Sequence, residues 1–174
     1  MEKTTYIGLD ISTSIIGISL MDKDYNLISL DYLDLRKKKD MFDKSREVAQ
    51  YFQNLSSKIN LKDVDVISIE ESMQSFRSGF SSAKTISQLN RFNGIVSYIV
   101  SSQLNKDPIY INVNSARKNL EIKLNKKSET STKDQILSWV DKDLNSCYEW
   151  PKKTLKSGPN KGNVKLIDAC YDMA

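Results

Sequence analysis

Histidine is absent from all 174 residues of this chain. Its absence removes the usual general base of nucleophilic triads and the commonest protein ligand of transition metals. Any hydrolytic chemistry must therefore depend on carboxylates. Because carboxylate oxygens and water prefer hard cations, Mg²⁺ is the metal cofactor that the composition favours, and we expect Mn²⁺ to substitute for it.

Cysteine is scarce, and long apolar runs are missing. The two cysteines, Cys147 and Cys170, lack the spacing of a zinc site or a disulfide framework, which indicates a reducing, intracellular setting. No apolar run reaches the roughly 18 residues of a membrane span, and the chain does not open with a basic segment followed by an apolar one. We therefore expect a soluble intracellular protein without membrane contact.

The composition that remains is that of a single globular domain, residues 1–174. Hydrophobic residues make up 39% of the chain, enough to bury one core but not two. Lysine and arginine number 26 against 22 acidic residues, a net charge of +4 that is unevenly distributed. The basic residues are therefore informative where they cluster.

The first elements are three antiparallel strands. In "YIGLDISTSIIGISL", Ile7, Leu9 and Ile11 alternate with smaller or polar residues, which predicts a strand, a Ser/Thr turn and a second strand. Gly17 in that second strand is expected to allow a close backbone approach. "NLISLDYLDL" predicts a third strand over residues 26–35.

The rest of the chain alternates helices and strands. The pattern predicts strands at 64–72 and 107–113, helices at 41–59, 81–104, 114–127 and 131–144, a mobile loop at 149–163 and a terminal helix at 164–174. This order indicates an α/β fold with a mixed five-stranded sheet and helices on both faces.

Four acids could meet in such a fold. Asp10 and Glu70 each end a buried strand, and Asp168 and Asp172 lie four residues apart, on one face of the expected terminal helix. Asp10 could instead cap the Ser/Thr turn that follows it. Converging carboxylates repel unless divalent cations lie between them, and two such ions can clamp a phosphodiester for hydrolysis.

A resemblance supports the nuclease interpretation. "IGLDIST", "SIEES", the "SSAKTISQLNRFNGIVSYI" helix and the terminal "DACYDMA" resemble, in that order, RuvC-type Holliday-junction resolvases, especially their viral and phage branches. The resemblance implies a ribonuclease H-like fold, a homodimer, a setting that includes virus-infected host cells, and magnesium-dependent symmetric nicking of branched DNA that leaves 5′-phosphates and 3′-hydroxyls. Asp10 matches the first acid of the family and Glu70 the second, whereas Glu71 is expected on the opposite face of its strand.

The terminal match departs from the family pattern, in which two acids stand three residues apart. In one alignment Asp168 is the final acid and Lys165 replaces its partner; in the other, which we favour, Asp172 is the first acid of the pair. The second would then lie beyond Ala174. A helix without stop signals at Ala174 also suggests that the natural chain was cut there, which could leave the site incomplete.

Basic and aromatic residues between Glu70 and the last helix are candidates for DNA binding. In "QSFRSGF", Phe76 and Arg77 lie in a Gly/Ser-rich loop where resolvases of this type carry a junction wedge, although ordinary core anchoring explains the aromatic residues equally well. The basic candidates are Arg77, Lys84, Arg91, Arg117, Lys118, Lys123, Lys126, Lys127 and Lys133. A solvated basic face is the alternative for each lysine. The "RFNGIVSYIV" helix is a candidate dimer contact, although packing on its own sheet is the more favoured use of most of its side chains.

Three alternative functions share features with this sequence. A sugar-kinase or actin-like ATPase also opens with a hairpin like "GLDIST", but it needs two domains, for which 174 residues are too few. A non-catalytic ribonuclease H-like module that binds nucleic acid fits the same elements. A RuvC-type domain that cuts a single displaced strand, as in CRISPR effectors, keeps the fold and changes the substrate.

Overall fold

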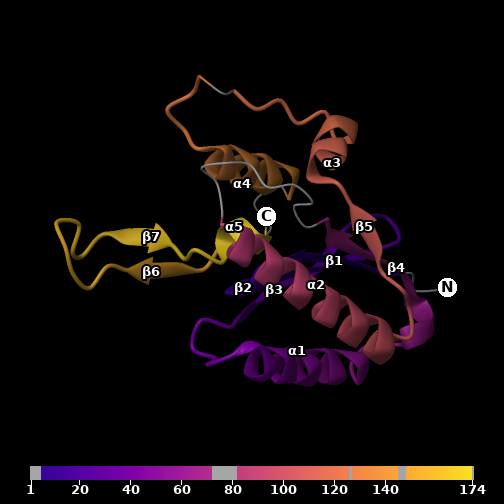
Figure 1. Cartoon of the computed structure of the whole chain (residues 1–174). Helices are drawn as coiled ribbons and strands as arrows, with labels where there is room; N and C mark the ends of the chain where they lie inside the picture. Colours follow the sequence, from indigo (N-terminus) through magenta and orange to yellow (C-terminus); the bar gives the residue numbers. More distant parts are fainter. Residues whose placement is uncertain (1–4, 72–81, 126, 145–147, 174) are drawn as a thin grey trace.

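The chain folds around one five-stranded mixed sheet. The computed structural model describes residues 5–71, 82–125, 127–144 and 148–173. The strands are β1 (Thr5–Ile11), β2 (Ile15–Asp22), β3 (Leu27–Asp34), β4 (Val64–Glu70) and β5 (Ile109–Ile111). Their order in the sheet is β3-β2-β1-β4-β5, antiparallel from β3 to β1 and parallel from β1 to β5. This is the α/β arrangement that the sequence predicts (Figure 1).

Two long helices cover one face of the sheet. They are α1 (Met41–Ser56) and α2 (Ala83–Leu104), capped by Asp40 and Ser82 through side-chain oxygens that accept backbone N–H groups. Phe52 of α1 and Phe92 of α2 are fully buried against Ile7 and Ile67 of the central strands. The inward face of β1 is therefore the apolar one, and Asp10 lies on the other face.

The opposite face carries shorter elements. These are α3 (Val113–Asn119), α4 (Thr132–Asp143) and α5 (Cys170–Met173). The short 3-10 turn η1 (Leu61–Asp63) immediately precedes β4. Figure 1 shows α3 and α4 on the side of the sheet away from α1. A second cluster, with Leu137, Trp150, Cys170 and Met173 buried, joins α4 and α5 to the β3 side of the sheet. The helices thus cover both faces, as expected.

The structure corrects the prediction for the last part of the chain. Residues 149–163 are not a plain loop, and the helix does not begin at Val164, because β6 (Lys152–Thr154) pairs with β7 (Val164–Leu166) in an antiparallel hairpin. Gly158 and Gly162, with φ of 82° and 91°, turn the chain between these strands. Helix α5 is consequently only four residues long. The helix predicted at 114–127 likewise ends at Asn119.

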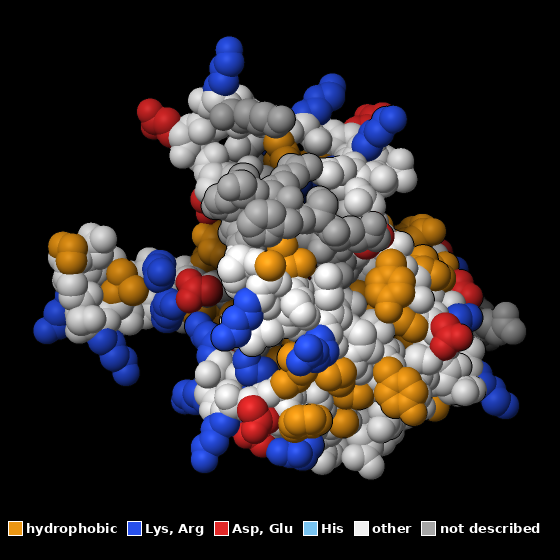
Figure 2. Space-filling view, viewed as in Figure 1, with side chains coloured by type: hydrophobic (Ala, Val, Ile, Leu, Met, Phe, Trp, Pro, Cys, Tyr) orange, Lys and Arg blue, Asp and Glu red, His pale blue; other side chains and the backbone are white. Residues whose placement is uncertain are grey.

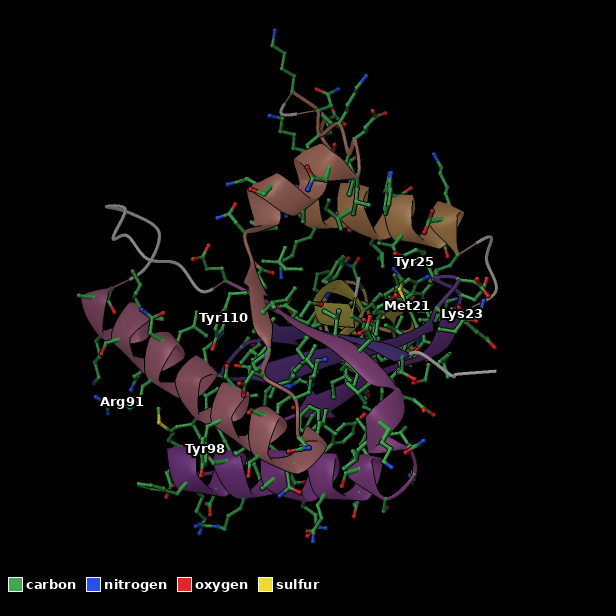
Figure 3. All side chains as sticks on the ribbon, turned by 90° about the vertical axis from the view of Figure 1, so that its right-hand side faces the viewer. Met21, Lys23, Tyr25, Arg91, Tyr98 and Tyr110 are labelled. Atoms are coloured by element: carbon green, nitrogen blue, oxygen red, sulfur yellow. The ribbon has the colours of Figure 1, made fainter. Side chains whose placement is uncertain are left out.

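The outer surface of α2 is partly apolar. Tyr98 is 75% exposed and points away from the sheet, as does Arg91 (Figure 3). Phe92 and Val96 of the same helix are buried in the core instead, so they serve packing. None of the helices in the described part of the chain is long and apolar enough to cross a membrane.

Candidate active site

Asp10 lies at the end of β1 without serving the turn beside it. Ser12 closes that turn: its Oγ donates to the carbonyl of Ile15 at 2.8 Å and accepts the N–H groups of Ser14 at 3.2 Å and Ile15 at 2.9 Å. Because Ser12 supplies these bonds, the interpretation of Asp10 as a turn cap is wrong. The Asp10 carboxyl instead borders a cavity on the polar face of the sheet.

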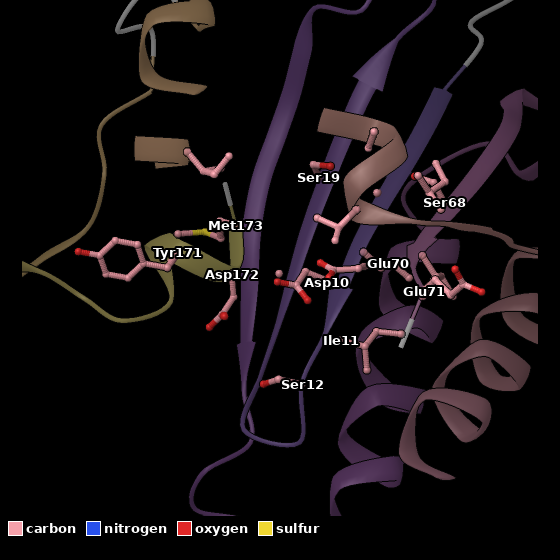
Figure 4. A pocket seen from close by; sticks show the side chains of 18 of the residues that line it. Asp10, Ile11, Ser12, Ser19, Ser68, Glu70, Glu71, Tyr171, Asp172 and Met173 are labelled. Atoms are coloured by element: carbon pink, nitrogen blue, oxygen red, sulfur yellow. The ribbon is translucent and has the colours of Figure 1, made fainter. Parts of the chain in front are cut away.

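Glu70 reaches the same cavity from the neighbouring strand. β1 and β4 run parallel, with Gly8 beside Ser68 and Leu9 beside Ile69, so Asp10 and Glu70 come next along each strand. In Figure 4 the Glu70 side chain extends toward Asp10, whereas the Glu71 carboxylate turns away from it. Asn112 donates to that Glu71 carboxylate at 3.3 Å. The two neighbouring strands thus carry Asp10 and Glu70 side by side, as predicted.

Asp172 completes the set from the C-terminal helix. Gly17 of β2 pairs with Asp10 across the sheet, and a Cβ atom at Gly17 would lie 1.7 Å from the backbone carbonyl oxygen of Asp172. Only glycine therefore lets α5 sit directly on β2, and this confirms the predicted close approach at Gly17. The contact places Asp172 on the cavity wall, near Asp10 at the end of β1 (Figure 4).

Asp168 lies outside the cavity. It precedes α5, so it does not share a helical face with Asp172 as the sequence suggests. Its side chain is 52% exposed and accepts from Lys153 at 3.1 Å, with Arg36 at 3.5 Å and Lys165 at 3.8 Å also near. The hydrogen bond from Lys153 is the main reason that the pKa of Asp168 is lowered.

Burial and mutual repulsion make the acids of the cavity hard to ionise together. Desolvation, followed by the charges of Glu70 and Asp172, raises the pKa of Asp10 from 3.8 to about 7. Desolvation also raises the pKa of Glu70 and of Asp172. A bound cation would therefore stabilise the carboxyl groups of Asp10, Glu70 and Asp172 in their charged form.

Two cations face these acids. Lys133 on α4 lies 3.9 Å from Asp172, and its charge lowers the pKa of Asp10, Glu70 and Asp172 alike. Arg117 of α3 lowers the pKa of Glu70. Both line the cavity. The sequence offers them only as two basic residues among many, because their proximity to the acids depends on how α3 and α4 fold over the sheet.

Helix α4 is fixed in this position by its own first turn. Ser131 caps the helix and donates to Asp134 at 2.6 Å, and Tyr171 of α5 donates to the other oxygen of Asp134 at 2.8 Å. These bonds connect α4 directly to the residue before Asp172. Lys133, between Ser131 and Asp134 in the sequence, is thereby held over the Tyr171 ring, 5.9 Å from its centre.

The cavity has a volume of about 720 Å³ and mixed walls. Asp10, Glu70 and the serines Ser19 and Ser68 line it from the sheet, and Ile122 and Ile136 line it from the α3–α4 side. Such a cleft can receive a charged, extended substrate on its polar floor. Its carboxylates suit a hard cation chemically. Among the described residues, however, no three Asp, Glu or Cys side chains stand close enough to form a ready metal cluster.

The other predicted DNA-binding residues are distributed more widely. Arg117 is half-buried in the cavity wall, whereas Lys84, Arg91, Lys118 and Lys127 are exposed outside it, as is Lys123. Phe76, Arg77 and Lys126 lie outside the described residues.

Comparison with known proteins identifies the fold. No family model and no curated protein sequence matches the chain. Among solved structures, it is similar to Thermus thermophilus RuvC in complex with a Holliday junction substrate, with a TM-score of 0.58 at 9% identity over 82% of this chain and 79% of that one. A second Thermus thermophilus RuvC structure gives a TM-score of 0.57 at 11% identity, covering 98% of this chain and 91% of that one. The fold is thus RuvC-like, of the ribonuclease H-like class.

Proposed function

We propose that this chain is a structure-selective endonuclease that resolves four-way or branched DNA. The observation that carries the proposal is the convergence of Asp10, Glu70 and Asp172 on one cavity of a RuvC-like fold. A Thermus thermophilus RuvC of the same fold has been solved with a Holliday junction substrate, which makes branched DNA the first substrate to test. The finer placement in a viral or phage branch rests on the sequence motifs alone.

The donor set of the cavity fits Mg²⁺, with Mn²⁺ as a substitute. Desolvation, followed by repulsion from Glu70 and Asp172, raises the pKa of Asp10 to about 7, and a hard cation would offset both effects. Asp10 and Asp172 would hold one ion, and Asp10 and Glu70 a second. Metal ions held there would supply Lewis-acid activation of water and charge stabilisation at the leaving 3′ oxygen, for hydrolysis to a 5′-phosphate and a 3′-hydroxyl.

The protein's own groups position the scissile phosphate. Arg117 of α3 and Lys133 of α4 line the cavity together with the acids, where they can hold non-bridging phosphate oxygens. Ile122 and Ile136 give the same cavity an apolar wall, and a lower local dielectric strengthens electrostatic interactions. We propose that a homodimer related by a twofold axis presents two such cavities to opposite strands of a junction.

The test is cleavage of a labelled synthetic four-way junction, compared with a linear duplex of the same sequence, with Mg²⁺ or EDTA. We expect paired nicks with Mg²⁺ only. Asp10→Asn and Asp172→Asn should each lower the rate on the order of a hundredfold or more, as expected for a group that stabilises charge in the transition state. Asp168→Asn is the matched control, because Asp168 lies four residues away and outside the cavity.

Two outcomes would contradict this assignment. Equal loss of cleavage in Asp168→Asn and Asp172→Asn would favour the alternative alignment, in which Asp168 is the final acid. Tight junction binding without nicks in either metal would favour the non-catalytic ribonuclease H-like module. Extension of the C-terminal helix by a turn, with an acid three residues after Asp172, would then show whether a missing ligand is the cause.

A further inference from the structure

The hairpin between α4 and α5 projects from the body of the molecule. We call residues 151–167, which contain β6 and β7, the basic arm. Its ladder pairs Lys152 with Leu166 and Lys153 with Lys165. The ladder extends beyond the strands, since the N–H of Leu155 donates to Asn163 at 2.9 Å and that of Gly162 donates to Leu155 at 2.9 Å. Figure 1 shows the arm standing clear of the sheet and of α4.

The basic arm carries charge of one sign. It contains five lysines and no aspartate or glutamate. Four of them are exposed: Lys165 near the base, and Lys152, Lys156 and Lys161 along the length of the arm and at its tip. Figure 2 shows lysine side chains spreading from the arm into solvent. A surface segment whose charges are all positive favours a polyanion as its partner.

The base of the arm is fixed to the body. Lys153 and Lys165 oppose each other, an arrangement of like charges that is unfavourable on its own. Asp168 lies near both and near Arg36, at 3.1 to 3.8 Å, and so joins the two strands of the arm to the end of β3. The N–H of Ile167 also donates to the carbonyl of Pro151 at 3.1 Å. The arm therefore leaves the body in a defined direction.

The base of the basic arm lies close in sequence to the proposed active site. Only Asp168 and three further residues separate the end of the arm from Asp172 on the cavity wall. We propose that the basic arm binds the phosphate backbone of a DNA duplex that extends from the cavity, an inference that rests on the proposed function. An extended strand of six residues reaches roughly 20 Å, and duplex DNA offers a charge about every 1.7 Å along its axis. The arm can therefore contact several phosphates.

The chemistry of the tip separates DNA from an anionic membrane surface. The residues that turn the chain at the tip are Ser157, Gly158, Pro159 and Asn160, which include no aromatic or long aliphatic side chain. A segment that binds a membrane surface buries such side chains between the headgroups. Backbone phosphates need only the lysines and polar groups that the arm presents. Contact with phosphates predicts an affinity without sequence preference.

The test measures the salt dependence of DNA binding without metal, so that no cleavage occurs. Dissociation constants for a four-way junction and a linear duplex are determined in EDTA between 50 and 300 mM KCl. In the variant Lys152→Ala/Lys156→Ala/Lys161→Ala, we expect affinity for both DNAs to fall at least about tenfold at 100 mM salt. The slope of log K against log[KCl] should decrease by about 2 to 3, close to 0.9 for each lost phosphate contact.

Two further variants make the comparison specific. Lys58→Ala/Lys62→Ala/Lys106→Ala removes the same charge from exposed positions after α1, in η1 and after α2, and should retain the wild-type slope. Replacement of the three arm lysines by arginine preserves the charge and should retain both slope and affinity. Circular dichroism spectra and melting temperatures that match those of the wild type show that each variant is folded.

The outcomes distinguish the arm from the resolvase function. If the alanine variant of the arm keeps the wild-type slope while the wild type cuts junctions, the arm proposal is overturned and the proposed function stands. If the slope falls but no junction is cut in Mg²⁺, the arm binds DNA and the resolvase assignment fails. Loss of binding to phosphatidylserine vesicles, with DNA binding unchanged, would also overturn the proposal and assign the arm to a membrane surface.

Discussion

At the scale of single residues, Asp10 has the least favourable environment of the acids in the cavity. It is withdrawn from water on the polar face of β1, and both Glu70 and Asp172 repel its charge, so its pKa rises from 3.8 to about 7. Lys133 offsets only part of this effect. A group with such a pKa makes the folded protein less stable whenever it is ionised. The same position is the one from which a bound cation gains most.

The first prediction concerns the stability of Asp10→Asn. Because the folded-state pKa is above the unfolded value, ionisation of Asp10 lowers stability as pH rises from about 4 to about 7, and the full penalty is present at pH 8. We expect the substitution to raise the free energy of unfolding at pH 8 by about 1 to 3 kcal/mol, given about 1.4 kcal/mol per pH unit and some solvent screening. At pH 4 the effect should vanish. Urea unfolding in EDTA measures both values.

Asp168→Asn should change the free energy of unfolding at pH 8 in the opposite direction to Asp10→Asn. The pKa of Asp168 is lowered by its hydrogen bond from Lys153, so its charge contributes stability that is present at pH 8 and is lost as pH falls. Its replacement should therefore never stabilise the protein at pH 8. A loss of stability in Asp10→Asn at pH 8 would show that the Asp10 carboxylate is favourably paired, contrary to its raised pKa.

The sequence was sufficient to find two of the acids, and for the third it favoured Asp172 without separating it from Asp168 by position. Asp10 and Glu70 each end an apolar strand, so their adjacency follows from the strand order. Asp168 and Asp172 have the same spacing arguments in their favour, and only the late start of α5 separates them in space. Lys133 is one lysine among many in the sequence. Its place beside three acids depends on the packing of α4 against α5.

At the scale of elements, α5 depends on β2 for its position. Four residues are too few for a stable isolated helix. It is held by Cys170 and Met173 in the second core cluster and by the contact of its backbone with Gly17. Because this contact fixes Asp172 relative to Asp10, the geometry of the site is set by a glycine that bears no functional group.

The second prediction is therefore that Gly17→Ala damages the site. A Cβ atom would meet the carbonyl oxygen of Asp172 at 1.7 Å, and backbone cannot move aside as a flexible side chain does. We expect a loss of about 1 to 3 kcal/mol in unfolding free energy, as for overpacked cores, together with junction cleavage reduced more than tenfold. Urea unfolding and the cleavage assay measure the two effects.

Gly94→Ala is the matched control for this prediction. A Cβ at Gly94, in the middle of α2, would meet no atom within 4 Å. The change should leave stability unaltered or raise it by up to about 1 kcal/mol, because alanine favours helices. If Gly17→Ala retained both stability and cleavage, the close contact between the α5 backbone and β2 would not be required, and the prediction would be wrong.

The basic arm is an element that could not be predicted from the sequence. Its strands contain three residues each, too few to display an alternating pattern. Lysine, glycine and proline around them are typical of loops, and the prediction of a loop followed. The pairing of Lys153 with Lys165 is unfavourable locally and depends on Asp168 and Arg36, which no local pattern reveals. The long helices α1 and α2, with full turns of periodic apolar residues and caps, were predictable for the opposite reason.

At the scale of the whole molecule, one chain supplies one cavity and one basic arm. A four-way junction is resolved only when two strands are cut, so a single chain would leave a nicked product. The proposed twofold assembly would solve this problem, because it would present two identical sites to two strands of like polarity. The outer surface of α2 is suited to such a contact, since Tyr98 is 75% exposed on it and large apolar side chains are enriched at interfaces.

The last prediction follows from this arrangement. On a supercoiled plasmid that extrudes a cruciform, the wild type should yield mainly linear product, because both strands are cut within the lifetime of one complex. Tyr98→Asp should shift sedimentation from dimer to monomer and the product to nicked circles, because it places a charge in the contact. Phe42→Asp changes a side chain that is equally open, at 71% exposure on α1, and should alter neither. Linear product from a monomeric Tyr98→Asp protein would mean that α2 pairing is not what coordinates the two cuts.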